Sequence, residues 1–322
     1  MKLTVWGARG SLPTPLTSSL YQERLREVLK RARDTNLHDP IAIDRFIERL
    51  PDHLATIVGG ETTCYELQDG ARRFILDMGS GVRRLGLHML QDGFADGNGT
   101  AHIFFSHTHY DHVEGFPFFA PQFVPGNHFI FHSPYPDLED RLRALMHHPF
   151  FPVDFDYPLA TREFHLLEAG RIYDIDSAQV EIMPQNHPGG SYAYSITLGG
   201  KKIVYGGDAE YPNMEPEATK DYEHFIANAE VLIFDTMYTY EDVVTNKVDW
   251  GHSNARIGAE LAWRAGVKRL LLSHHDPIAS DHELWAKIND ADQHLRYRAN
   301  RAGADALPVQ VSLAYEALTL EL

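Results

Sequence analysis

A six-residue run, HTHYDH, begins at His107 and constrains this chain more than any other segment. An apolar IFF triplet lies just before it, which predicts that the run starts where a strand ends. His107 and His109 are two residues apart, so at an extended strand end they point the same way and can bind one metal ion. Asp111 and His112 follow at once and can turn toward a second ion. The run therefore predicts a two-metal hydrolytic site.

Further residues with metal-binding side chains follow the ends of other expected strands or lie in the loops beyond them. They are Asp77, His187, Asp208, His252 and the adjacent pair His274 and His275. Strands that deliver their loops to one edge would gather these side chains into a single cleft. The sequence therefore predicts that the HTHYDH run and these residues form one site.

The chemistry of a two-metal site assigns different roles to these residues. A ligand that bridges two ions must offer two oxygens, which favours the carboxylate of Asp208. Asp77 is expected to orient the ligand imidazoles rather than to bind metal. His274 and His275 are adjacent and should point to opposite faces, so only one of them is expected to be a ligand. The residues alone leave that choice open.

His252 lies apart from the other candidate ligands. It follows a glycine and precedes a predicted helix, a position that suits a general acid protonating a leaving oxygen. The candidate catalytic residues are therefore His252, Asp111 and Asp208.

The composition indicates a soluble globular protein. The 322 residues are 43% hydrophobic and 23% charged, and we expect one domain over residues 1–322 with an insertion at 18–54. No apolar run approaches the ~20 residues that a membrane span needs. The N-terminus has no signal-peptide pattern. The single cysteine, Cys64, suits a reducing compartment, so a cytoplasmic location is expected.

The charge limits the class of substrate. The formal net charge is −16, so most of the surface should repel long polyanions. Long nucleic acids are therefore disfavoured as substrates, whereas small anions are permitted at a site that carries metal cations.

Short apolar strands alternate with turns and a few helices along most of the chain, which indicates the α/β class. The expected strands are 2–6, 62–67, 73–78, 102–106, 128–132, 180–183, 193–198, 202–205, 231–235, 269–273 and 309–315. The expected helices are 138–146, 254–265 and 281–300. Ser253 and Asn254 can cap the second of these helices.

Residues 18–54 depart from this alternation. They lack strand signals and contain a charged amphipathic pattern at 21–30 and a second helical segment at 41–50. We interpret them as a helical insertion. Packing or the pairing of two copies into a homodimer is favoured for it over a role as a lid.

Asp77 with its glycine-rich turn, the HTHYDH run, His187, Asp208 and His274 occur in the order typical of a known family. With these motifs the chain resembles the metallo-β-lactamase superfamily of binuclear metal hydrolases over nearly its whole length. The resemblance implies a four-layer αβ/βα sandwich with the metals at one edge of two sheets.

Three further segments resemble the phosphodiesterase branch of that superfamily, which includes ribonuclease Z and cyclic-phosphodiester hydrolases. They are WGARGSLP from Trp6, GETTC from Gly60 and GHSN from Gly251. Two residues depart from the branch pattern. Glu61 stands where asparagine is usual, and Asn254 stands where threonine is usual.

The resemblance also implies a set of metal ligands. It assigns one ion to His107, His109 and His187, the other to Asp111, His112 and His274, and the bridge to Asp208. It thus prefers His274 over His275. Two divalent ions are expected, with zinc favoured by the ligand types and manganese or iron as alternatives.

One departure bears on the substrate. Familiar ribonuclease Z proteins carry a long arm that grips transfer RNA between the positions matching His187 and Asp208, but only 20 residues separate them here. We therefore expect a phosphodiesterase that cleaves a small, possibly cyclic-nucleotide, diester by metal-bound hydroxide with His252 as general acid. The alternatives are a hydrolase of carboxylic esters, lactones or thioesters, and an RNA-processing nuclease of the ribonuclease Z type.

Overall fold

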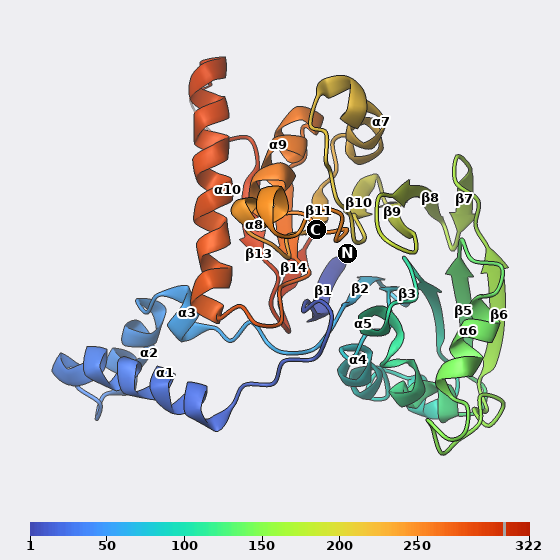
Figure 1. The fold of residues 1–322 in the computed structure, drawn as a ribbon. Helices are drawn as coiled ribbons and strands as arrows, with labels where there is room; N and C mark the ends of the chain where they lie inside the picture. The colour runs from blue at the N-terminus through green and yellow to red at the C-terminus, as the bar shows by residue number, and fades with distance from the viewer. Residues whose placement is uncertain (305–306) are drawn as a thin grey trace.

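Two seven-stranded β-sheets form the centre of the molecule (Figure 1). The computed structural model describes residues 1–304 and 307–322. The first sheet has the order β14 (Thr319–Glu321), β1 (Lys2–Gly7), β2 (Cys64–Asp69), β3 (Arg72–Leu76), β4 (Thr100–Phe104), β5 (His128–Ser133) and β6 (Thr161–Leu166). The second has the order β13 (Gln310–Leu313), β12 (Arg269–Ser273), β11 (Val231–Asp235), β10 (Lys201–Tyr205), β9 (Ser191–Leu198), β8 (Ala178–Gln185) and β7 (Ile172–Ile175).

Some of the helices cover the outer faces of the sheets, and the others lie in the insertion and in the connecting loops. The helices are α1 (Ser18–Arg31), α2 (Pro40–Glu48), α3 (Asp52–Ala55), α4 (Val82–Met89), α5 (Tyr110–Val113), α6 (Leu138–Leu145), α7 (Pro216–Ile226), α8 (Tyr240–Thr245), α9 (Ala255–Ala265) and α10 (Asp281–Ala302). Helices α4 and α6 pack on the first sheet, and α7, α9 and α10 pack on the second. Among the described residues, no helix is both long enough and apolar enough to cross a membrane.

The alternation of side chains along each strand explains why four layers form. In β11, Val231 and Ile233 point into the core between the two sheets. Their neighbours Leu232 and Phe234 point to the opposite face and pack with the helices outside. A strand that is apolar on both faces must be covered on both faces. The result is the predicted αβ/βα sandwich, so the expected fold class is confirmed.

The sheet topology brings many strand ends to one region. In the first sheet β3, β4 and β5 are parallel, and in the second β10, β11, β12 and β13 are parallel. Parallel neighbours end at the same edge of a sheet, so the loops after them lie close together. The chain ends also meet, because β1 pairs with β14 (Figure 1).

The predicted strands all overlap observed ones, but β6, β7 and β14 were not predicted, nor were α4, α5, α7 and α8. Strands β6 and β7 lie at the free edges of their sheets and are only partly buried, so they lack the apolar runs that mark central strands. The predicted helix at 254–265 begins one residue later, with Asn254 as its cap.

The predicted helical insertion is present as α1, α2 and α3. Figure 1 shows α1 and α2, in blue, extending away from the sheets beside the first turn of α10. Neither α1 nor α2 contains a buried residue. Arg24 of α1 forms an ion pair with Asp281 of α10, which joins the insertion to the body. The insertion therefore does not pack into the core, and its pairing with a second copy stays a prediction.

Candidate metal centre

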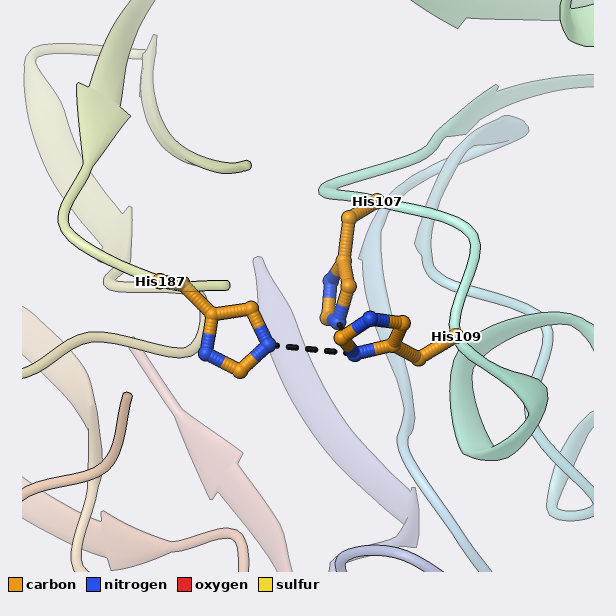
Figure 2. Close-up of side chains that lie close together, drawn as sticks. All are labelled: His107, His109 and His187. Carbon is orange, nitrogen blue, oxygen red and sulfur yellow. Dashed lines mark hydrogen bonds between the residues drawn. The ribbon is translucent and has the colours of Figure 1, made fainter. Parts of the chain in front are cut away.

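The side chains of three histidines, His107, His109 and His187, point toward one another (Figure 2). His107 and His109 lie in the loop between β4 and α5, and His187 lies in the loop between β8 and β9. The Nδ1 atom of His109 lies 3.1 Å from Nε2 of His107 and 3.1 Å from Nε2 of His187. One ligand atom from each ring lies within 4.8 Å of the others, as a shared ion requires.

A second group of possible ligands lies beside the first. It contains Asp111, His112, Asp208 and His274, and all four are buried. The Oδ2 atom of Asp208 lies 3.2 Å from Nε2 of His112 and 3.2 Å from Nε2 of His274. His274 Nε2 also lies 3.1 Å from Oδ2 of Asp111. The structure thus brings together the two ligand groups that the resemblance implies.

Asp208 lies between these two groups. Its Oδ2 atom is 3.6 Å from Nε2 of His107 and 3.9 Å from Nε2 of His187, in addition to its contacts in the second group. Asp208 follows β10 through Gly207, which has φ +64°. A Cβ atom on Gly207 would lie 2.8 Å from the Tyr192 carbonyl oxygen, so only glycine fits this turn. The position of Asp208 is that expected of a bridging carboxylate.

Hydrogen bonds at the Nδ1 atoms of two histidines leave their Nε2 atoms free to bind a cation. Nδ1 of His112 donates to Oδ2 of Asp77 at 2.8 Å, and Nδ1 of His187 donates to the Gly251 carbonyl oxygen at 2.8 Å. A neutral imidazole has one N–H, so both Nε2 atoms then turn lone pairs toward the Asp208 carboxylate. Converging lone pairs in a buried site repel each other unless a cation lies between them.

Asp208 keeps its negative charge in this setting. Burial alone would raise the pKa of its carboxyl group. Without a bound cation, positive charge on the nearby imidazoles of His274, His112 and His107 outweighs burial and holds the pKa well below its ordinary value, and bound cations in the same place would act in the same direction. A buried, ionised carboxylate among imidazoles matches the ligand types that zinc prefers.

Asp77 holds the HTHYDH loop rather than facing the ligand groups. Its carboxylate accepts hydrogen bonds from the Ser106 backbone N–H at 2.7 Å, the Ser106 hydroxyl at 2.6 Å and the Tyr205 hydroxyl at 2.7 Å. It also accepts the bond from His112 described above. Asp77 is completely buried, and these contacts place it behind the site, so its role in orienting the ligands stays a prediction.

The adjacent histidines His274 and His275 point in different directions. Nε2 of His275 donates to the Ala314 carbonyl oxygen at 2.8 Å, away from both ligand groups. His274 faces the site and is backed by Gly10, where a Cβ atom would lie 2.5 Å from the imidazole. The geometry therefore favours His274 as the ligand, and it gives the WGARGSLP segment a packing role against that ring.

His252 lies at the rim of both groups and is paired with a carboxylate. Its Nδ1 atom lies 2.9 Å from Oδ2 of Asp235, and its ring stacks on His274 with 4.9 Å between centroids. Burial lowers the pKa of His252, but Asp235 raises it more, to about 9. Asp235 was not predicted from the sequence. Asp235 ends β11 much as Asp208 follows β10, but no feature of the sequence pairs it with His252.

Glu210 is a second residue that was not predicted. It is 5% exposed, and its carboxylate accepts the backbone N–H groups of Asp249 at 3.0 Å and Gly251 at 3.1 Å. The carbonyl of Gly251 in turn accepts the bond from His187. Glu210 thus fixes the loop that carries His252 to the loop after β10.

Asn254 explains how the unusual GHSN segment is accommodated. Its side-chain oxygen accepts the backbone N–H groups of Arg256 at 3.0 Å and Ile257 at 3.1 Å. These bonds satisfy free donors at the start of α9. Asparagine here does the capping work that threonine can also do.

Residues 72–275, more than half of the chain, match the beta-lactamase superfamily domain. The chain is also similar to a ribonuclease Z of Picrophilus torridus, with 38% identity over 93 residues. That alignment covers 29% of this chain and 26% of the relative. The similarity therefore spans about a quarter of the relative's length.

Two solved structures resemble the whole fold. One is the metallo-beta-lactamase fold protein YhfI from Bacillus subtilis, with a TM-score of 0.61, 16% identity and coverage of 100% of this chain and 98% of that one. The other is unliganded yeast PDE1, with a TM-score of 0.63, 12% identity and coverage of 100% and 99%. At these identities the likeness concerns the fold alone.

Proposed function

Because the chain belongs to the beta-lactamase superfamily, we propose that it is a binuclear metal-dependent hydrolase of small phosphodiesters. The observation that carries the choice of phosphodiester is the His252–Asp235 pair at the rim of both ligand groups. Cleavage of an alkyl phosphodiester releases a strongly basic alkoxide, which needs a proton as it departs. His252 is placed to supply that proton.

The proposed ligands divide into two groups with one shared member. The first ion is assigned to His107, His109 and His187, the second to Asp111, His112 and His274, and Asp208 is shared. Divalent cations bound there would supply an activated water and stabilise negative charge on the phosphoryl oxygens. The mixture of imidazole and carboxylate favours zinc and is compatible with manganese or iron.

His252 and Asp235 handle the proton in the proposed reaction. A water oxygen loses one proton to solvent and forms a bond to phosphorus, and the bond from phosphorus to the leaving oxygen breaks with its electron pair moving to that oxygen, which takes a proton from His252. A proton from solvent then restores the acid form of His252. Nδ1–H of His252 stays bonded to Asp235, so the proton given to the leaving oxygen comes from Nε2. Asp235 raises the pKa of His252, which favours the protonated form that a general acid needs.

The choice of a small substrate rests on shape and charge. Between His187 and Asp208 the chain forms only the antiparallel hairpin of β9 and β10, where ribonuclease Z proteins of the familiar type carry an arm. The net charge of −16 opposes the approach of a long polyanion. These two features favour a small diester over the RNA substrate of a ribonuclease Z-type nuclease.

A hydrolase of carboxylic esters, lactones or thioesters is the competing enzyme. The same ligand groups could support it, because metal cations also polarise carbonyl oxygens. Thiolates and many alkoxides of activated esters leave without a positioned imidazolium. Such an enzyme would give the His252–Asp235 pair no evident task.

The proposal is tested with protein loaded with zinc or manganese and offered bis-p-nitrophenyl phosphate, followed by a panel of cyclic nucleotides. We expect diester cleavage that disappears after dialysis against a chelator and returns when metal is restored. p-Nitrophenyl acetate, a lactone and a thioester serve as competing substrates. If protein that holds two metals cleaves one of these substrates but leaves every diester intact, the proposed phosphodiesterase is wrong and the competing ester, lactone or thioester hydrolase is favoured.

Glu210→Gln should impair His252 without removing the metals. Glutamine offers one acceptor where glutamate offers two, so one of the N–H groups of Asp249 and Gly251 loses its partner. We expect kcat for a cyclic nucleotide to fall by about 10–100-fold, the range for residues that position others at a metal site. The loss should be smaller with a p-nitrophenolate leaving group, which departs without a proton.

Metal content and thermal unfolding of Glu210→Gln serve as controls. Equal losses with both leaving groups at full metal content would show that Glu210 does not act through His252.

A further inference from the structure

Two aromatic rings lead outward from His252, the first buried and the second exposed. The ring of Tyr238 contacts His252 edge-on with 5.5 Å between centroids, and it contacts Trp250 edge-on with 6.4 Å between centroids. Tyr238 is nearly buried, but Trp250 is 54% exposed. The three rings form a continuous path from the proposed acid to the protein surface.

The loop that carries Trp250 is held on both sides. Glu210 binds the backbone of Asp249 and Gly251, which flank Trp250 in the sequence. The backbone N–H of Trp250 itself donates to the Lys247 carbonyl oxygen at 3.3 Å. A rigid, exposed tryptophan gives a large contact surface at low cost in conformational entropy.

A positive charge lies over this tryptophan. Nζ of Lys247 is 3.6 Å from the centroid of the Trp250 ring and 5.5 Å from that of Tyr238. The chain as a whole has a net charge of −16, so a cation at this place runs against the average surface. It would attract a substrate that combines an aromatic ring with a phosphate.

Tyr135, which contacts the loop that carries His187, is another aromatic residue near the ligand groups. The guanidinium of Arg141 covers the Tyr135 ring at 4.2 Å, and the Tyr135 hydroxyl donates to the Gly190 carbonyl oxygen at 3.1 Å. Arg141 is itself fixed by a bond of 3.0 Å to the Thr108 hydroxyl. A cation covers one face of each ring, but Tyr135 is only partly exposed and is fixed by its hydroxyl, whereas Trp250 is 54% exposed and keeps more open surface for a stacking ring.

We propose that Trp250 and Lys247 form the subsite for the group that carries the leaving oxygen, and that this group is a nucleoside whose base stacks on Trp250. The inference rests on the proposed function, because it places the leaving oxygen at Nε2 of His252. When the bond from phosphorus to that oxygen breaks, His252 supplies the proton and the nucleoside hydroxyl forms. The base then reaches the exposed ring of Trp250, which the buried ring of Tyr238 joins to His252.

The test compares two cyclic diesters that differ in the base. Metal-loaded wild type, Trp250→Ala and Trp250→Phe are assayed with adenosine 2′,3′-cyclic phosphate and with glycerol 1,2-cyclic phosphate, which has no ring to stack. Trp250→Ala should lower kcat/KM for the adenosine substrate by about 10-fold or more beyond any change for the glycerol substrate. Trp250→Phe should restore most of that difference.

Two further measurements separate stacking from a general disturbance of the loop. Tyr297→Ala is the matched control, because Tyr297 is 53% exposed and lies under Arg301 at 5.7 Å on α10. Adenosine 3′-phosphate should quench tryptophan fluorescence in the wild type, and Trp250→Phe should lose most of that quenching. Tyr297→Ala should match the wild type both in kcat/KM for the two substrates and in fluorescence quenching.

The outcomes distinguish this inference from the proposed function. If the wild type cleaves both diesters and Trp250→Ala changes their kcat/KM values equally, the subsite is wrong and the phosphodiesterase stands. Cleavage of the glycerol substrate alone also overturns the subsite. If metal-loaded wild type cleaves no diester, including bis-p-nitrophenyl phosphate, the proposed function fails and the subsite fails with it.

Discussion

Asp208→Ala is expected to lower phosphodiester cleavage by about 10³-fold or more, because stabilisation by bound metal is worth several kcal/mol. Among the residues that the structure describes, Asp208 is the one whose carboxylate oxygen lies within 4 Å of histidines in both ligand groups. Its removal takes a shared ligand from each ion at once. Metal content, measured by mass spectrometry after dialysis, should fall together with kcat.

Two controls separate the loss of metal from a loss of fold. Asp208→Asn preserves the shape of the side chain but not its charge, so it should also lose metal. Asp290→Ala removes a carboxylate from the surface of α10, where Asp290 pairs with Arg256, and should keep both metal and activity. An Asp208→Ala protein that retains two metals and cleaves bis-p-nitrophenyl phosphate at the wild-type rate would rule out the shared-ligand assignment.

The central strands were predictable because their signal is local. The sequence VLIFD of β11 is apolar on both faces, which is typical of a strand covered on both sides. In the structure β11 lies between the core that separates the two sheets and the outer layer of helices. Strands β6 and β7 were missed because their exposed edges require no such pattern. Their existence depends on the neighbour to which each one pairs, and a neighbour distant in sequence leaves no local trace.

The same distinction holds for the candidate site. His107, His109, Asp111 and His112 stand together in one run, so their shared chemistry is visible before folding. The choice between His274 and His275 could not be made from the residues alone. It depends on a hydrogen bond from the His275 ring to the Ala314 carbonyl oxygen, and these two residues are distant in the sequence. The resemblance supplied that choice, and the geometry agrees with it.

Asp235 and Glu210 needed the structure because each acts on a distant loop. Asp235 looks like the last residue of an ordinary buried strand, and its partner His252 is 17 residues further along the chain. Glu210 follows Asp208 by two residues, yet its carboxylate binds the backbone at Asp249. Nearly every residue has a backbone N–H group, so the residue types in the sequence do not indicate which of these groups needs a side-chain acceptor.

His252→Ala should lower kcat for a cyclic nucleotide by about 10²–10⁴-fold, the usual contribution of a general acid. The leaving alkoxide of the nucleotide is strongly basic, so it depends on a proton from Nε2 of His252. Cleavage of bis-p-nitrophenyl phosphate should fall much less, because p-nitrophenolate is stable without a proton. Metal content should stay at the wild-type level, since His252 belongs to neither proposed ligand set.

The pH profile gives an independent test of the same role. His252 has a pKa raised to about 9 by Asp235, so the acid form is lost as pH rises through that value. Positive charge from bound cations lowers the pKa, which places the alkaline fall in kcat for a cyclic nucleotide at or below pH 9. Asp235→Asn removes the carboxylate charge that raises this pKa, so the fall should move to lower pH. His252→Ala should lack the fall altogether, and an unchanged alkaline limb in that variant would assign the proton to another group.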